Sequence, residues 1–72
     1  MNHFKKYIRT GVILCTPWSP DFDMSRVSIS LADKEKGSPK VGDMISKNPV
    51  DDGDLWLIEK DYFIENFKEV LR

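Results

Sequence analysis

The chain has 72 residues, of which 40% are hydrophobic and 32% charged, and its net charge is −1. This composition excludes a disordered tail. A chain of this length buries only about 60% of its unfolded surface, so we expect one domain over residues 1–72 with a thin core. Residues 1–6 are expected to be flexible. The single cysteine, Cys15, excludes an intramolecular disulfide and favours a reducing cytoplasm over secretion.

Apolar runs are short and the charge is uneven. The run at residues 12–15 is four residues long, too short to cross a bilayer, and the N-terminus lacks a signal peptide, so neither membrane insertion nor export is expected. Residues 1–10 hold Lys5, Lys6 and Arg9 without an acid, whereas residues 51–72 hold seven acids and three bases. Three bases are few for phosphate contacts, so nucleic-acid binding is only a weak alternative.

The first half of the chain predicts two strands and a loop. Residues 7–16 end in an apolar run before Pro17, typical of a strand with both faces partly covered. Residues 17–23 hold two prolines and two aspartates, which indicates a loop. Residues 26–30 alternate between polar and apolar, as in a half-buried strand, and Ser30 then has the form of a helix N-cap that starts one or two turns ending at Gly37.

The second half predicts a hairpin and a longer helix. A short strand at residues 44–47 is followed by Asn48-Pro49, and Asp52-Gly53 is the strongest hairpin signal. Residues 55–58 form an apolar strand, expected to be central or covered by a helix. That helix is expected over residues 61–71, with Asp61 as N-cap, Arg72 near the negative end of the dipole, and a buried face. The face consists of Phe63, Phe67, Val70 and Leu71.

Residues for catalysis or metal binding are scarce. His3 and Cys15 supply two ligands at most, whereas structural zinc needs four. The acids of residues 51–54 lack the ligand spacing of a calcium loop, and residues 37–42 lack the ending of a P-loop. The acids are expected in turns and on an exposed helix face rather than facing each other across a cleft. We therefore expect no enzyme, no metal and no cofactor.

Aromatic residues are the best candidates for contact with a partner. Trp18 and Phe22 lie in the predicted loop, where they either cover a thin core or present an aromatic patch. Trp56 either fills the core or, if its strand is an edge, stands beside Trp18 at the surface. Lys40, between Gly37 and Gly42, is a candidate for closing over an anionic ligand.

The second half of the chain also carries a family pattern, over about residues 27–67. It consists of Val27-Ser28-Ile29-Ser30, Ala32-Asp33, Gly37-Ser38-Pro39-Lys40, Gly42-Asp43-Met44-Ile45, Asn48-Pro49, Asp54, Trp56-Leu57 and Tyr62-Phe63-x-x-Asn66-Phe67. This pattern resembles small proteins of tailed phages and prophages. The resemblance implies a phage product made in the bacterial cytoplasm, and it assigns no mechanism and no functional residue.

The sequence thus predicts an α+β domain in which three or four mostly antiparallel strands form a small curved sheet, with the C-terminal helix packed on one face. The expected function is an accessory protein that binds a host protein, with antagonism of a defence or regulatory factor as one form of that binding. The candidate contacts are Trp18, Phe22, Lys40 and Trp56. The alternatives are sequestration of a small molecule or nucleotide, and weak nucleic-acid binding. Homodimerisation is compatible with each of them, since a thin core often gains from it.

Overall fold

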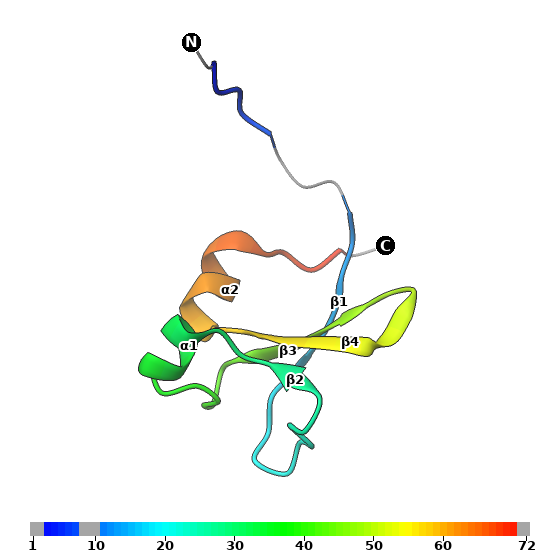
Figure 1. Cartoon of the computed structure of the whole chain (residues 1–72), viewed down its shortest axis with the longest axis vertical. Coiled ribbons are helices and arrows are strands. Elements are labelled where there is room, and N and C mark those ends of the chain that lie inside the picture. Colours follow the sequence, from blue (N-terminus) through cyan, green and yellow to red (C-terminus); the bar gives the residue numbers. More distant parts are fainter. Residues whose placement is uncertain (1–2, 8–10, 71–72) are drawn as a thin grey trace.

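The structure is a computed structural model, and it describes residues 3–7 and 11–70. Its body is a four-stranded sheet in the order β1-β3-β4-β2 (Figure 1). The strands are β1 (Leu14–Pro17), β2 (Val27–Ser28), β3 (Met44–Asn48) and β4 (Asp51–Ile58), and the helices are α1 (Leu31–Glu35) and α2 (Lys60–Asn66). The expected α+β class, with a small sheet and a C-terminal helix, is confirmed.

Two of the three strand pairs are antiparallel. β3 pairs antiparallel with both β1 and β4, whereas β2 runs parallel to β4. Parallel neighbours need a crossover connection, and here α1 and β3 lie between β2 and β4 in the chain. The apolar strand at residues 55–58 is therefore central, as expected, because it belongs to β4 with a neighbour on each side.

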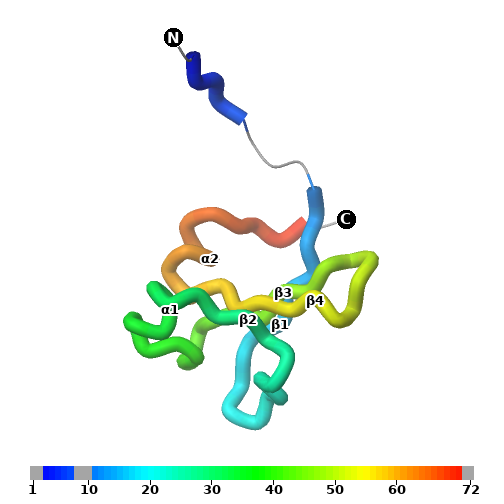
Figure 2. The backbone as a smooth tube through the Cα atoms, in the orientation of Figure 1, coloured from blue at the N-terminus to red at the C-terminus, as the bar shows by residue number. Residues whose placement is uncertain are grey.

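The two faces of the sheet are covered differently. α2 lies on one side of the strands and the loop of residues 18–26 lies on the other (Figures 1 and 2). The register places Cys15, Ser46 and Trp56 across one face and Thr16, Ile45 and Leu57 across the other. Among the described residues, the buried apolar side chains are Ile45, Leu57 and Ile58. Three such side chains make a thin core, since each contributes only about 1.5–3 kcal/mol.

The short helix α1 begins and ends as its sequence predicts. The Ser30 side chain accepts a hydrogen bond from the backbone N–H of Asp33 at 3.1 Å. At the other end, the N–H of Gly37 donates to the Lys34 carbonyl and that of Ser38 to the Asp33 carbonyl, which is the Schellman arrangement. Gly37 adopts the required positive φ, at 93°.

The first strand is shorter than predicted. β1 covers Leu14–Pro17 rather than residues 7–16; of that prediction, residues 8–10 lie outside the described residues and 11–13 are not in a strand. A strand can pair only as far as its partner extends, and Leu14 already faces Lys47, next to the end of β3. Similarly, β2 covers only two of the five predicted residues, 26–30.

The hairpin turns earlier than predicted. Asp52-Gly53 lies inside β4, and the chain reverses at Pro49 and Val50 instead. The Asn48 side chain accepts a hydrogen bond from the Val50 N–H at 3.0 Å, a side-chain turn that closes the hairpin before the Asp-Gly pair is reached.

The last helix is also shorter and begins one residue earlier. α2 ends at Asn66, and Phe67 is already extended, with φ −126° and ψ 151°. The Asn66 side chain donates to the Tyr62 carbonyl at 2.9 Å, so it competes for an acceptor at the helix end. Val70 is exposed rather than buried, and Leu71 and Arg72 lie outside the described residues. The N-cap is Glu59, not Asp61.

Candidate binding site

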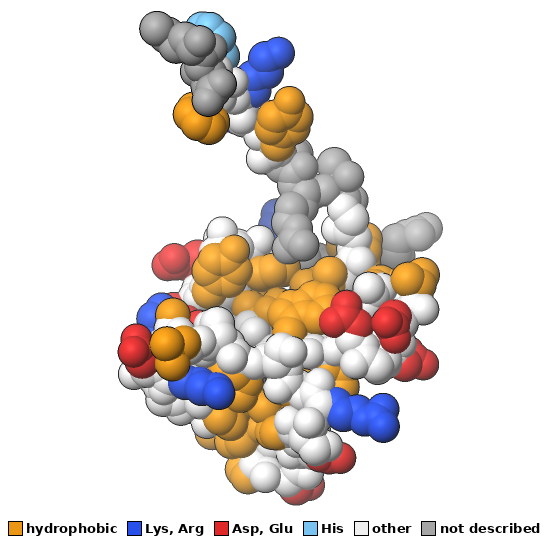
Figure 3. Space-filling model, viewed as in Figure 1, with side chains coloured by type: hydrophobic (Ala, Val, Ile, Leu, Met, Phe, Trp, Pro, Cys, Tyr) orange, Lys and Arg blue, Asp and Glu red, His pale blue; other side chains and the backbone are white. Residues whose placement is uncertain are grey.

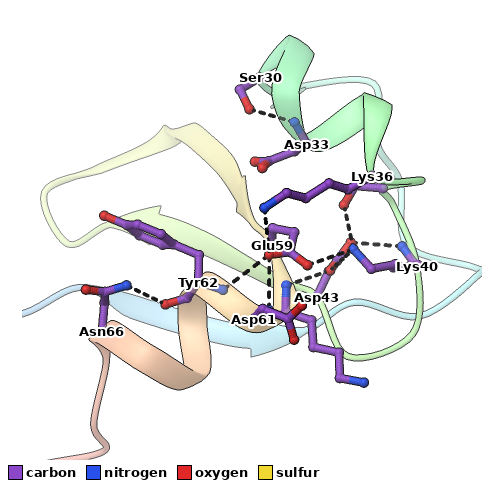
Figure 4. A network of polar contacts seen from close by, with 11 residues as sticks. Ser30, Asp33, Lys36, Lys40, Asp43, Glu59, Asp61, Tyr62 and Asn66 are labelled. Atoms are coloured by element: carbon purple, nitrogen blue, oxygen red, sulfur yellow. Dashed lines mark hydrogen bonds and ion pairs between the residues drawn. The ribbon is translucent and has the colours of Figure 1, made fainter.

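Polar side chains are buried where the loop after α1 meets the start of α2 (Figure 4). We define Ser38, Lys40, Asp43 and Glu59 as the polar cluster. Asp43 is 0% and Glu59 2% exposed. The expectation that the acids lie in turns and on exposed surfaces is therefore wrong for these two. Buried carboxylates need partners, and both have them.

Asp43 ties the loop to the last helix. Its Oδ2 accepts from the backbone N–H of Lys40 at 2.9 Å, and its Oδ1 accepts from the backbone N–H of Lys60 at 2.9 Å. Lys60 is the first residue of α2, so one side chain fixes where the helix starts relative to the loop. Gly42 permits this approach: its φ is +102°, and a Cβ there would lie 2.6 Å from Cδ of Lys60.

Glu59 both caps α2 and holds the loop. Its Oε1 accepts from the backbone N–H groups of Asp61 and Tyr62 at 3.1 and 3.2 Å, which satisfies two free donors of the first turn. Its Oε2 accepts from Lys40 Nζ at 3.0 Å. Lys40 Nζ also donates to Ser38 Oγ at 3.3 Å and lies 3.4 Å from Asp43 Oδ1. One ammonium group thus bridges both carboxylates.

The polar cluster holds its groups in their charged forms. The hydrogen bond from Lys40 lowers the pKa of Glu59 to about 2, against the opposing effect of burial. Burial raises the pKa of Asp43, but the Ser38 hydroxyl and the backbone N–H groups of Lys40 and Lys60 outweigh it, so that the pKa is lowered. The hydrogen bond to Glu59 raises the pKa of Lys40.

This geometry suits a structural clamp better than a reactive site. A lysine whose pKa is raised is a poor nucleophile, and carboxylates with lowered pKa values are poor proton donors. Lys40, the candidate for an anionic ligand, lies between two carboxylates that would repel an anion. Within residues 3–7 and 11–70, no three His, Cys, Asp or Glu side chains are placed to share a metal ion.

A second feature, an open groove, separates β1 from α2 and the segment that follows it. The groove has a volume of about 1010 Å³, and we define it by the residues that line it. The lining residues are Gly11, Val12, Ile13, Leu14, Cys15, Met44, Tyr62, Phe63, Asn66, Phe67, Lys68, Glu69 and Val70. The rings of Phe63 and Phe67 stack at 5.3 Å and Tyr62 lies 6.1 Å from Phe67, which gives one wall an aromatic surface.

The early end of α2 keeps this groove open. Because the helix ends at Asn66, residues 67–70 are not helical, and Val12 and Val70 stay 62% and 66% exposed. On the opposite wall, β1 is an edge strand of the sheet. Hydrophobic side chains form a broad area on this face of the molecule (Figure 3). An exposed apolar area of this kind is typical of an interaction site.

The predicted contact residues are not brought together. Trp56 is half-buried in the central strand, on the face that α2 covers. Trp18 continues β1 through a hydrogen bond from its N–H to the Asp43 carbonyl, so strand alternation places it on the opposite face, with Thr16. Phe22 lies on that second face as well, beside Leu55 in a shallow hollow. A shared patch of Trp18 and Trp56 would require β4 to be an edge strand, and it is not.

The sequence predicts three of the groove residues, Phe63, Phe67 and Val70, on a buried helix face. The i, i+4 spacing of Phe63 and Phe67 predicts one helix face, whereas Phe67 follows the last residue of α2 in extended conformation, with its ring stacked on that of Phe63. Both side chains are half-buried. The signal that was present is Asn66, the last residue of α2, which lies between Phe63 and Phe67 in the chain and whose side chain donates to the Tyr62 carbonyl.

Comparison with known proteins adds no assignment. No family model, curated protein or solved structure matches this chain. Within the described residues, no helix has the length and apolar character to cross a membrane.

Proposed function

We propose that this chain is a non-catalytic accessory protein of a tailed phage that binds a host protein in the bacterial cytoplasm, and that the groove is its binding site. The observation that carries the proposal is that apolar side chains are exposed at the groove, although charged side chains are buried elsewhere in the same chain. Tyr62, Val12 and Val70 are exposed at its walls, whereas charged groups are buried in the polar cluster. Exposed apolar surface is retained at a cost in solubility, so it is usually functional.

The groove suits an extended protein segment. One wall is an edge strand, whose outer backbone groups can pair with an added chain, and the other is aromatic. Aromatic side chains carry a large share of binding energy at protein interfaces. The partner segment is therefore expected to be extended and to place apolar side chains against Phe63 and Phe67.

Capture from bacterial lysate tests this proposal when it is paired with matched variants. Phe67→Ser removes half of the aromatic stack, whereas Ile64→Ser alters an α2 side chain that is 67% exposed and does not line the groove. We expect the native chain and Ile64→Ser to retain the same stoichiometric host protein and Phe67→Ser to lose it, with circular dichroism showing that all three are folded.

Site-specific photo-crosslinking locates the contact. A benzophenone side chain at position 12, in the groove, should link to the captured protein, and one at position 41, exposed but outside the groove, should not. Equal crosslinking at both positions, or equal capture by Phe67→Ser, would contradict the proposal that the groove is the site.

The nucleotide-binding alternative makes a separate prediction. A ligand present at about 100 times its dissociation constant adds about 2.7 kcal/mol to the free energy of unfolding. The carboxylates around Lys40 argue against a bound anion. A thermal-shift screen of nucleotides is accordingly expected to be flat, and a clear upward shift would favour this alternative over protein binding.

A further inference from the structure

The N-terminal segment carries apolar side chains that its own chain does not cover. We define residues 3–7 as the arm. Phe4 is 97% and Tyr7 87% exposed, and the arm extends away from the body of the molecule (Figures 1 and 3). Burial of aromatic side chains of this size favours association, so the arm can contribute to binding another surface.

The arm and the groove have complementary features. The arm carries Lys5 and Lys6 and no acid. The helix and tail that form the aromatic wall, residues 60–70, carry three acids and two lysines. The charged residues that line the groove itself are Lys68 and Glu69, whose charges cancel, so the fit between the arm and the groove depends on their apolar side chains. The groove also presents the stacked rings of Phe63 and Phe67, against which aromatic side chains pack well.

We propose that the arm of one copy occupies the groove of a second copy, so that two chains exchange arms and close each other's binding site. The inference rests on the proposed function in one respect, namely that the groove is the binding site. It adds a regulator of that site: a host protein would have to displace the arm, and the arm would resemble the segment that displaces it.

A second copy fits better than the arm's own chain. Residues 11–15 form one wall of the groove, and only residues 8–10 separate that wall from the arm. A chain reversal takes four residues, so an arm returning to its own groove would consume part of the wall or of the arm. Exchange needs no reversal. It also fills both grooves at once about a two-fold axis, the commonest symmetry of soluble dimers.

The spacing of the arm's aromatic residues supports simultaneous contact. In an extended segment with three residues per turn, positions 4 and 7 lie on the same side, about 9 Å apart. Both rings can then face the wall of Phe63 and Phe67, while Lys5 and Lys6 point away from it. A thin core of three buried apolar side chains among the described residues gains from such association.

Sedimentation velocity of the full chain gives the first test. We expect a dimer for the native chain, and a monomer both for an arm variant, Phe4→Ser with Tyr7→Ser, and for a groove variant, Val12→Ser with Val70→Ser. Each variant keeps one half of the contact, so mixing the two should restore a heterodimer with one intact arm and groove. Association should weaken at least about tenfold in either variant alone, corresponding to about 1.4 kcal/mol. A native chain that is monomeric at high concentration, or an arm variant that still dimerises, overturns the inference.

Crosslinking distinguishes exchange from return of the arm to its own groove. Cys15 lines the groove, so a bis-maleimide can join it to His3→Cys in the arm, a change that keeps both aromatic residues of the arm. Exchange predicts a covalent dimer, and a matched variant, Ser25→Cys in the loop on the other face, should give none. An internally linked monomer would overturn the inference in favour of an arm that folds back.

The two proposals fail in different ways. If the chain forms the dimer but captures no host protein, only the proposed function is contradicted. If the chain is a monomer and still captures its partner through the groove, only the exchange of arms is contradicted.

Discussion

The polar cluster and the groove lie at opposite ends of α2 and invert the usual distribution of side chains. In the polar cluster, Asp43 and Glu59 are almost completely buried and every carboxylate oxygen has a partner. In the groove, Val12, Tyr62 and Val70 are exposed. The first region loses stability if any partner is removed, because a buried charge is left unpaired. The second region can lose an apolar group and stay folded.

Because of this difference, the polar cluster stabilises the fold and the groove residues remain free to bind, although the core of the chain is small. Satisfied polar contacts at one end of α2 set the position of the helix, and they do so without the aromatic residues at the other end. The phenylalanines are thereby left available for a partner. Variants of the two regions should accordingly differ in kind, with stability changing at the polar cluster and association changing at the groove.

The largest effect is expected from Asp43→Ala. The change leaves the backbone N–H groups of Lys40 and Lys60 without their acceptor and Lys40 without one of its carboxylates, so we expect the free energy of unfolding to fall by about 3–5 kcal/mol. Urea titration measures this loss. The control is Asp52→Ala, whose carboxylate is 88% exposed in its pair with Lys47 and should contribute only about 0.2–1 kcal/mol. Equal losses in the two variants would show that burial at the cluster does not matter.

A smaller effect is expected from Gly42→Ala. Its positive φ makes a side chain unfavourable there, whereas the flexible Lys60 side chain can move aside, so the free energy of unfolding should fall by about 1–2 kcal/mol. Gly11→Ala is the matched control, because a Cβ built on Gly11 has no atom within 4 Å. Thermal or urea unfolding of both variants gives the comparison, and a Gly42 variant as stable as the control would contradict the strain expected from the positive φ.

The polar cluster should also impose a pH dependence. The pKa of Glu59 is about 2 in the folded chain and 4.5 ordinarily. Since the folded value is the lower one, the stabilisation is complete above the ordinary pKa and is lost as the pH falls from 4.5 toward 2. The urea midpoint should drop across that window. Hydrogen bonds from Ser19 and Ser25 also lower the pKa values of Asp21 and Asp23, so the part due to Glu59 is the difference between the native chain and Glu59→Gln. Parallel pH profiles for the two proteins would contradict the assignment.

The smallest change in stability is expected from the groove variant, Val12→Ser with Val70→Ser. Both side chains are about two-thirds exposed, so at concentrations too low for association the free energy of unfolding should change by no more than about 0.5 kcal/mol. The same variant should lose host capture and dimerisation. A large loss of stability in the monomer would place these residues in the core and remove the distinction between the two regions.

Local sequence signals predicted several elements correctly. Ser30 and Gly37 mark the two ends of α1 as expected, because capping depends on side chains and φ angles within a few residues. The central apolar strand at residues 55–58 and its neighbour at residues 44–47 were also correct in kind. The turn at Pro49 was missed, although Asn48 carried the signal, because Asp52-Gly53 is the stronger pattern when local sequence alone is considered.

The candidate site was much less predictable. Trp18, Phe22 and Trp56 were chosen for their residue type, but exposure depends on which side of the sheet each occupies, and that follows from the register. Val12, Phe67 and Val70 line the groove only because α2 ends early and β1 lies at the edge. No spacing within the sequence contains that information.

The sequence by itself determined that this chain is a small α+β domain with a short capped helix, a central apolar strand and a C-terminal helix, because each of these depends on periodicity and on contacts between near neighbours. Only the tertiary structure decided that Asp43 and Glu59 are buried around Lys40 and that the aromatic face of α2 stays partly open. Both outcomes depend on residues that are far apart in the chain and come together only when the sheet forms. Asp43 and Lys40 lie 16 and 19 positions before Glu59, and the two walls of the groove are about 50 positions apart.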